Sequence, residues 1–171
     1  KIIREKNEIE IKELEIYQEY SNISGIYENI DVENDKLNVV SPTFFYLGKN
    51  SKILDKTTSS TATYANYSNW LKENELSILP TIENNESVSS TLLTYSQRSK
   101  AINELCEKII YYQYKGININ FENIDDINSF YRFLIELAPR FRESGLLICV
   151  TINDNMNKDK ISKIVDYVIE K

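Results

Sequence analysis

The sequence predicts an α/β protein built on a parallel sheet, and three observations support this prediction. The chain has 171 residues, a length that suits a single domain. Its residues are 42% hydrophobic and 27% charged, which is near the globular average. Short apolar runs alternate with longer segments of helical spacing, as in βαβ units. We therefore expect one domain over residues 1–171, in which residues 1–12 form an N-terminal lead-in of uncertain structure.

Six short apolar segments predict the strands. They span residues 13–17, 37–45, 77–82, 116–121, 146–152 and 167–169. The second strand is the firmest of these predictions, since it contains the adjacent valines Val39 and Val40 and has Pro42 near its end. Residues 48–50, with the sequence Gly-Lys-Asn, predict a turn after it.

Four longer segments predict helices between these strands. The first spans residues 64–73, the second runs to residue 112 with Ser96 as its N-cap, and the last spans residues 159–165. The third begins after Asp125 or Asp126 and ends at Gly145. We expect Pro139 to kink or interrupt this third helix, because proline cannot donate a backbone hydrogen bond.

The composition excludes several kinds of chemistry. The sequence contains no histidine, which removes Ser-His-Asp and Cys-His pairs and any metal site with histidine ligands. A formal net charge of −6 argues against a nucleic-acid partner. Cys106 and Cys149 are isolated within apolar runs, where we expect buried side chains and neither a disulfide nor a zinc site. We therefore expect no metal and no cofactor, and acid–base chemistry is left to carboxylates, tyrosines, lysines or the two thiols.

The sequence carries no signal for a membrane span or a signal peptide. No apolar stretch approaches the roughly 18 residues that a span requires. Residues 1–18 are dense in charge and lack a long apolar core. Two explanations stay open: the protein is cytosolic, or processing or cloning has removed its start.

The most informative segment is the predicted strand at residues 116–121 together with the residue that follows it. Side chains alternate between the two faces of a strand. One face is apolar and is expected to lie under the helices: Ile117, Ile119 and Phe121. The opposite face is polar, with the carboxylate at the carboxyl end: Asn118, Asn120 and Glu122. That end is where parallel α/β folds collect ligands and catalytic groups.

Two interpretations of this polar face stay open. Buried polar side chains require hydrogen-bonding partners, so the row is either a hydrogen-bonded polar ladder without catalysis or a saccharide site. A saccharide site, in turn, is either active or decayed.

The same segment resembles the D-G-x-D-x-D-x-E signature of glycoside hydrolase family 18, the chitinase-like enzymes. Here it is K-G-I-N-I-N-F-E over residues 115–122. Gly116 and Glu122 match, Asn118 and Asn120 are amide replacements of acids, and Lys115 departs from the pattern. Further stretches resemble the bacterial cell-wall and spore-cortex branch of this family, from about residue 14 to the C-terminus. They span residues 39–45, 79–85, 133–139, 147–152 and 164–169.

The resemblance implies a (β/α)8 barrel of the TIM type that cleaves β-1,4-linked N-acetylglucosamine glycans with help from the substrate's own acetamido group. It implies that Glu122 is the general acid, that Asn120 replaces the aspartate that orients the acetamido group, and that Asn118 replaces the inner acid. The same resemblance places four residues near strand ends, where they would either face sugar or belong to ordinary core packing: Tyr17, Phe44, Phe45 and Asn84. Its implied partner is a polysaccharide or peptidoglycan strand, and its implied location is extracellular, at the cell envelope or in the spore.

Two departures from the family bear on activity. An amide at position 120 cannot offer a full negative charge to the intermediate, which is expected to slow or abolish turnover. A complete barrel of this kind needs about 250 residues, so we expect only the first five to six β/α units here, and this fragment alone to be inactive. The chain is then a piece of a longer protein, a proteolytic product, or a domain completed by a dimer partner or by the missing C-terminal segment. A catalytically inactive glycan-binding or scaffold module is the alternative to an enzyme.

Overall fold

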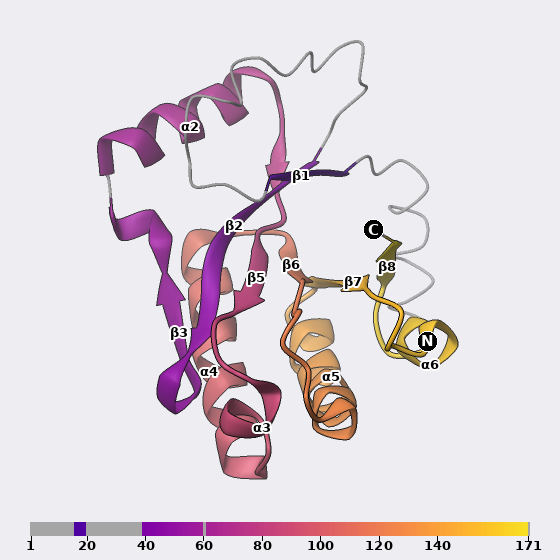
Figure 1. Ribbon diagram of the computed structural model, residues 1–171. Helices are drawn as coiled ribbons and strands as arrows, with labels where there is room; N and C mark the ends of the chain where they lie inside the picture. The colour runs from indigo at the N-terminus through magenta and orange to yellow at the C-terminus, as the bar shows by residue number, and fades with distance from the viewer. Residues whose placement is uncertain (1–15, 20–38, 60, 171) are drawn as a thin grey trace.

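The computed structural model describes residues 16–19, 39–59 and 61–170. These residues form a curved sheet with helices packed on its outer face (Figure 1). Most strands run in chain order across the sheet, each parallel to its neighbour. Their bounds are β1 (Ile16–Glu19), β2 (Val39–Gly48), β5 (Thr81–Asn84), β6 (Gly116–Ile119), β7 (Leu147–Ile152) and β8 (Tyr167–Glu170). This order is that of an arc of a (β/α) barrel, as expected from the sequence.

Two further strands pair with β2 away from this main path. β3 (Lys52–Asp55) returns antiparallel along the end of β2, and β4 (Ser77–Ile78) lies parallel to its start. The sequence predicts one strand over 77–82, but Pro80 has no backbone N–H and the strand is split into β4 and β5 around it. The β3 hairpin is absent from the sequence-based prediction, although the turn at 48–50 that leads into it is correct.

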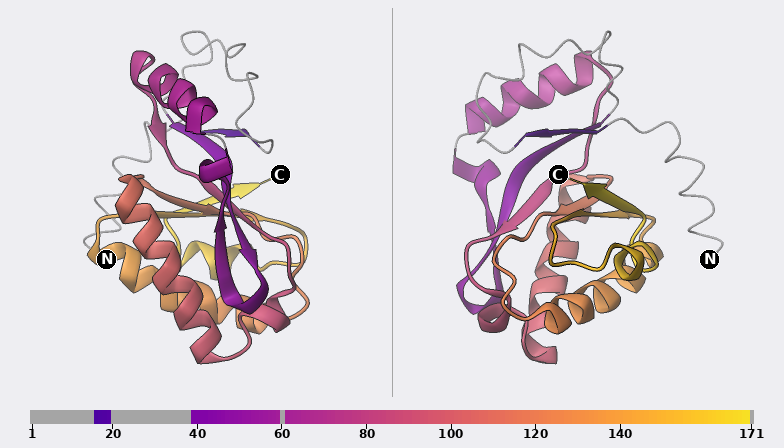
Figure 2. Two further views of the ribbon diagram at one scale, coloured as in Figure 1. Left: turned by 90° about the vertical axis from the view of Figure 1, so that its left-hand side faces the viewer. Right: turned by 45° about the vertical axis from the view of Figure 1, so that its right-hand side comes forward.

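The helices occupy the connections between the parallel strands. They are α2 (Thr61–Glu73), α3 (Val88–Thr91), α4 (Tyr95–Tyr112), α5 (Ile127–Glu143) and α6 (Lys158–Ser162), with short 3-10 turns η2 (Lys49–Ser51) and η3 (Lys56–Ser59). Figures 1 and 2 show α4 and α5 side by side against one face of the sheet. Within the described ranges no helix is long and apolar enough to cross a membrane.

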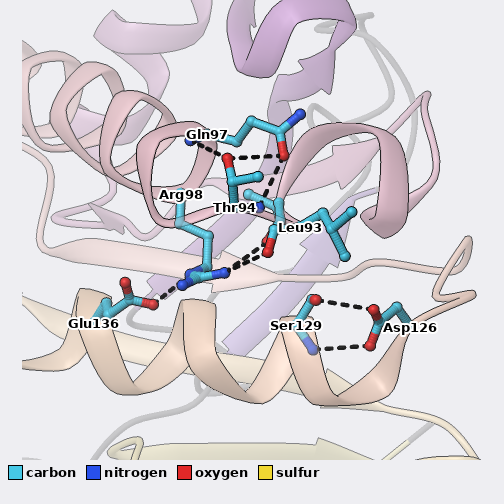
Figure 3. Close-up of polar contacts among 8 residues, drawn as sticks. Leu93, Thr94, Gln97, Arg98, Asp126, Ser129 and Glu136 are labelled. Carbon is cyan, nitrogen blue, oxygen red and sulfur yellow. Dashed lines mark hydrogen bonds and ion pairs between the residues drawn. The ribbon is translucent and has the colours of Figure 1, made fainter.

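Two helix predictions are corrected by local chemistry. The N-cap of α4 is Thr94, not Ser96, because Thr94 and Gln97 form a reciprocal capping box (Figure 3). Pro139 lies inside α5 without interrupting it. Both Pro139 and Ile135, whose carbonyl the proline ring leaves unpaired, are on the exposed face of α5, where water can satisfy that carbonyl.

A buried arginine fastens the helical layer. Arg98 on α4 is only 5% exposed, and its guanidinium pairs with Glu136 on α5 (Figure 3). The same guanidinium donates hydrogen bonds to the carbonyls of Leu92 and Leu93 in the turn before α4. Because a buried charge is tolerated only with such partners, Arg98 fixes α4, α5 and this turn relative to one another.

The sheet separates two unequal cores. The larger lies between the sheet and the helices and includes Ile117, Ile119 and Phe121, as the strand alternation predicts. The smaller lies on the concave inner face and consists of Val39, Leu79, Leu147 and Cys149, with Tyr167 and Ile169 packed against them. Cys106 and Cys149 are both buried free thiols, also as predicted.

Candidate functional site

The candidate site lies where β5, β6 and β7 end. Gly116 starts β6 because the β7 backbone passes very close to it: a Cβ added there would lie 2.0 Å from the Leu147 carbonyl oxygen. The close approach keeps β6 and β7 in a register that pairs Asn118 with Cys149. This gives a structural reason for the glycine at this position of the family signature.

Asn118 is fully buried on the inner face, within a row of polar side chains. Its Nδ2 donates to Thr81 Oγ1 over 3.1 Å, and its Oδ1 accepts from Thr151 Oγ1 over 3.2 Å. Thr81 Oγ1 in turn lies 2.8 Å from Ser41 Oγ. The row crosses four adjacent strands, β2, β5, β6 and β7. For Asn118 itself, therefore, the hydrogen-bonded polar ladder that the sequence left open is present.

Asn120 continues the pairing one step beyond β6. Its backbone N–H donates to the Ile82 carbonyl over 2.9 Å, and the residue is 2% exposed. Within the described residues its side-chain amide takes part in no hydrogen bond. Asn120 thus differs from Asn118: the polar row accounts for the side chain of Asn118 and does not include that of Asn120.

Glu122 lies three residues after the last residue of β6 and is exposed to solvent. Its backbone N–H donates to Asn84 Oδ1 over 3.0 Å. The carboxylate therefore projects from a loop at the carboxyl end of the sheet, and this loop is tied to the end of β5.

All the hydrogen-bonding capacity of the Asn84 side-chain amide is taken up by backbone groups. Oδ1 accepts from the N–H groups of Glu122 and Asn123, and Nδ2 donates to the carbonyls of Asn123 and Glu86. A primary amide offers two acceptor sites and two donors, so these four hydrogen bonds leave none for a sugar.

The two phenylalanines that the family resemblance placed facing sugar are buried in the outer core. Phe44 is 1% exposed and packs edge-on against Tyr64 and Tyr67 of α2, and Phe45 is 0% exposed. The pairing of β2 with β5 shifts by one residue between Thr43 and Phe45, as at a β-bulge. Both adjacent rings consequently point towards the helices, an outcome that strict alternation does not give. Tyr17 lies in β1, paired with Val40.

A second contact ties the loops beside Glu122. Asp125 Oδ1 accepts from the Ser89 N–H over 2.8 Å, and Asp125 Oδ2 accepts from the Ser89 hydroxyl. The Ser89 hydroxyl, and then its N–H, lower the pKa of Asp125. Of the two predicted cap candidates, Asp125 and Asp126, the N-cap of α5 is Asp126, which accepts from the Ser129 N–H (Figure 3).

Two hollows flank the sheet. One, of about 440 Å³, opens at the carboxyl ends of β7 and β8 and is lined by Ile152, Asn153, Asp154 and Glu170. The other, of about 270 Å³, lies at the opposite end between α2 and the start of β6, beside Tyr64, Tyr112 and Tyr114. Burial, together with a hydrogen bond between the Tyr114 and Tyr64 hydroxyls, raises the pKa of Tyr114 far above its ordinary value, so its phenol stays neutral. Across the part of the chain that the structure describes, no three His, Cys, Asp or Glu side chains form a group that could hold a metal ion.

Comparison with solved structures places this arrangement in a known fold. The chitinase of Chromobacterium violaceum superposes with a TM-score of 0.73 at 17% identity, over 92% of this chain and 55% of its own. The class V chitinase of Pseudomonas fluorescens gives 0.76 at 17% identity, over 91% and 52%. The spore cortex-lytic enzyme SleL of Bacillus megaterium gives 0.72 at 17% identity, over 91% and 41%.

The chain therefore has the fold of a chitinase-type (β/α) barrel and spans about half the length of the solved structures it matches. The resemblance to glycoside hydrolase family 18 inferred from the sequence is confirmed at the level of this fold. No protein-family model matches the chain, and no curated protein matches its sequence.

Proposed function

We propose that this chain is a glycoside hydrolase-like domain that acts on β-1,4-linked N-acetylglucosamine glycans. The observation that carries the proposal is Glu122, an exposed carboxylate at the carboxyl end of β6 in a chitinase-type barrel. In this fold class that edge of the sheet is where catalytic groups stand. The resemblance of residues 115–122 to the family signature assigns Glu122 the role of general acid.

The reaction that follows is substrate-assisted. The acetamido oxygen of the sugar attacks its own anomeric carbon while the Glu122 carboxyl protonates the leaving glycosidic oxygen, whose bond to that carbon breaks. Water then opens the oxazolinium ring and returns a proton to Glu122. Asn120, whose amide has no partner among the described residues, would accept the acetamido N–H and hold the group in line.

The amides at 118 and 120 favour a second candidate function, a glycan-binding or scaffold module without turnover. Asn120 cannot supply the charge that stabilises the intermediate, and Asn118 is held by Thr81 and Thr151. Glu122 favours the enzyme, because a purely binding module has no need of a proton donor at this position.

A peptidoglycan or chitin-like strand is the substrate class we propose, with the cell envelope or spore as the place of action. The spore cortex-lytic enzyme with this fold supports the peptidoglycan alternative, and the chitinases support the chitin-like one. In the described sheet β8 pairs with β7 alone, and we propose that a further barrel segment or a second copy of the chain pairs with its other edge.

The test is release of reducing ends from chitin oligomers and from peptidoglycan by the completed barrel, that is, the chain together with the further segment or second copy proposed above. It is measured for the wild-type protein and for Glu122→Gln. We expect the variant to lose all measurable turnover, because Glu122 is the only acid in residues 115–122. Glu107→Gln, an exposed glutamate on α4, is the matched control and should leave turnover unchanged. Glycan binding without turnover in any of the three proteins would favour the binding module; neither binding nor turnover would exclude both functions.

A further inference from the structure

The loop that carries Glu122 has a support that comes from a different strand. β6 ends at Ile119, so Glu122 lies in a segment without regular secondary structure. The side chain of Asn84, at the end of β5, reaches this segment. Four hydrogen bonds of 2.8–3.3 Å join the Asn84 amide to the backbone, and three of them go to Glu122 and Asn123.

The geometry of these bonds is specific to asparagine. Oδ1 accepts two consecutive N–H groups, those of Glu122 and Asn123, while Nδ2 donates to the Asn123 carbonyl. An amide side chain supplies both the acceptor and the donor that this turn requires; alanine supplies neither, and aspartate supplies only the acceptor.

Neighbouring contacts fasten the same two loops. The Val88 N–H donates to the Asn123 carbonyl over 3.2 Å, and Ser89 holds Asp125. These contacts lie on the far side of Asn123 from Glu122. Of these contacts between the two loops, the Asn84 contact is the one that reaches the Glu122 backbone N–H. Within the Glu122 loop itself, the Ile124 N–H donates to the Glu122 carbonyl over 3.2 Å.

We propose that Asn84 is a positioning residue that sets the placement of the Glu122 carboxyl, and that it is not a sugar ligand. The catalytic part of this inference rests on the proposed function, whereas the contact itself does not. Since a displacement of about 1 Å at a reacting group can lower a rate by roughly 10²-fold, a loosened Glu122 loop is expected to lower kcat. Substrate affinity is expected to change little, because the Asn84 amide has no group left for sugar.

The first measurement is amide hydrogen exchange at Glu122 and Asn123, read residue by residue, in the protein without any glycan. In Asn84→Ala both amides lose their acceptor, and we expect their exchange to accelerate by about tenfold or more. The matched control is Asn85→Ala, which removes the next asparagine along the chain. Asn85 is exposed and its side chain forms no hydrogen bond with the described residues, so exchange at Glu122 should not change.

The second measurement is the division between kcat and KM on a soluble N-acetylglucosamine oligomer. We expect Asn84→Ala to lower kcat by about 10²-fold with KM within about twofold of wild type, and Asn85→Ala to leave both unchanged. Asn84→Asp keeps the acceptor, so protection of the Glu122 amide should be restored.

The outcomes separate the two proposals. Unchanged exchange at Glu122 in Asn84→Ala overturns the positioning role, and so does a raised KM at constant kcat, which is the signature of a lost sugar contact. If no variant and no wild-type sample shows turnover, the proposed function fails. The exchange data alone then decide whether Asn84 holds Glu122. If Asn84→Ala does not fold, amide exchange in Asn84→Asp decides the matter: retained protection at Glu122 supports the Oδ1 contact, and lost protection overturns it.

Discussion

The two faces of the sheet differ in what fills them. The outer face is covered by aromatic and aliphatic side chains from the helices, such as Phe130 and Phe133 against Phe121. The inner face has only a small apolar cluster at its base, and above it lie the polar row that includes Asn118 and then Asn120. Most of the apolar packing is therefore on the outer face of the sheet, and the polar side chains of the candidate site are on the inner face.

Because of this difference, a polar residue on the inner face can be exchanged without loss of the fold. Substituting an acid by an amide on the inner face leaves the outer core untouched. In the same segment, Asn120 and Phe121 are adjacent and both nearly fully buried. The Asn120 side chain lies on the inner face, whereas the Phe121 ring lies in the outer core. Variants at such adjacent positions should change stability or turnover, but not both.

The largest effect is expected from Phe121→Ala. The ring is 1% exposed and lies 5.8 Å from Phe130 and 6.0 Å from Phe133, centroid to centroid. Its removal leaves a cavity that should lower the free energy of unfolding by about 3–5 kcal/mol. Urea unfolding followed by circular dichroism measures this loss. Phe121→Leu, which fills more of the space, should lose less; equal losses in the two variants would contradict the packing argument.

Next in size is the effect of Asn120→Asp on turnover. If the protein turns over glycan, restoring the carboxylate should raise kcat by up to about 10²-fold, because the added charge acts on an intermediate that forms only during the reaction. Binding of the oligomer should be nearly unchanged. The measurement is initial rates of reducing-end release. A wild-type rate already at ordinary glycosidase levels, with a lower rate in Asn120→Asp, would show that the amide has another role.

Asn118→Leu should have a smaller effect, and on stability instead of turnover. The change keeps the volume but removes the acceptor of Thr151 and a donor to Thr81. Breaking two buried hydrogen bonds is expected to lower the free energy of unfolding by about 1–3 kcal/mol, measured as for Phe121→Ala. A variant as stable as wild type would mean that the polar row contributes no net stability.

The sequence predicted well whatever depends on periodicity. Alternation along 116–121 correctly assigned Ile117 to the outer core and Asn118 to the inner face. Phe44 and Phe45 were placed near sugar by the family resemblance and not by alternation, and the structure has both in the outer core, the alternative that the sequence left open. A bulge shifts the register there, and nothing in the local pattern indicates it. The N-cap at Thr94 was predictable from the sequence, because Thr94 and Gln97 match the Thr-x-x-Gln capping-box pattern. The prediction of Ser96 did not use this pattern.

The support of the candidate site was not predictable in the same way. Asn84 meets Glu122 across 38 residues of sequence, through contacts between a side chain and the backbone of an irregular loop. Such contacts leave no periodic signal and depend on two strand ends meeting at one edge of the sheet. The Ser89–Asp125 contact is of the same kind. The sequence pattern thus pointed to Glu122 as the candidate acid, and only the fold shows which side chain holds its loop.

The smallest expected effect is a pH dependence from the Ser89–Asp125 contact. Hydrogen bonds from the Ser89 hydroxyl and N–H lower the pKa of Asp125 in the folded protein. A carboxyl whose pKa is lower when folded contributes stability at pH values above its unfolded pKa, and that contribution disappears as the pH falls through the folded pKa. Wild type should therefore melt higher than Asp125→Asn at neutral pH, and the difference should shrink below about pH 4, where the carboxylate becomes protonated.

Melting temperatures of both proteins between neutral pH and about pH 2 measure this difference, with Asp154→Asn, at an exposed aspartate in another loop, as the control. Asp125 lies at the surface, where salt screens charges. High salt should still reduce the melting difference only in part, because the partners of Asp125 are a hydroxyl and an amide, and hydrogen bonds from neutral donors are screened less than ion pairs. A melting difference that stays constant across this range would mean that the Ser89–Asp125 contact does not depend on the charge of Asp125. The Glu122 loop would then be held by its neutral contacts alone, with Asn84 foremost among them.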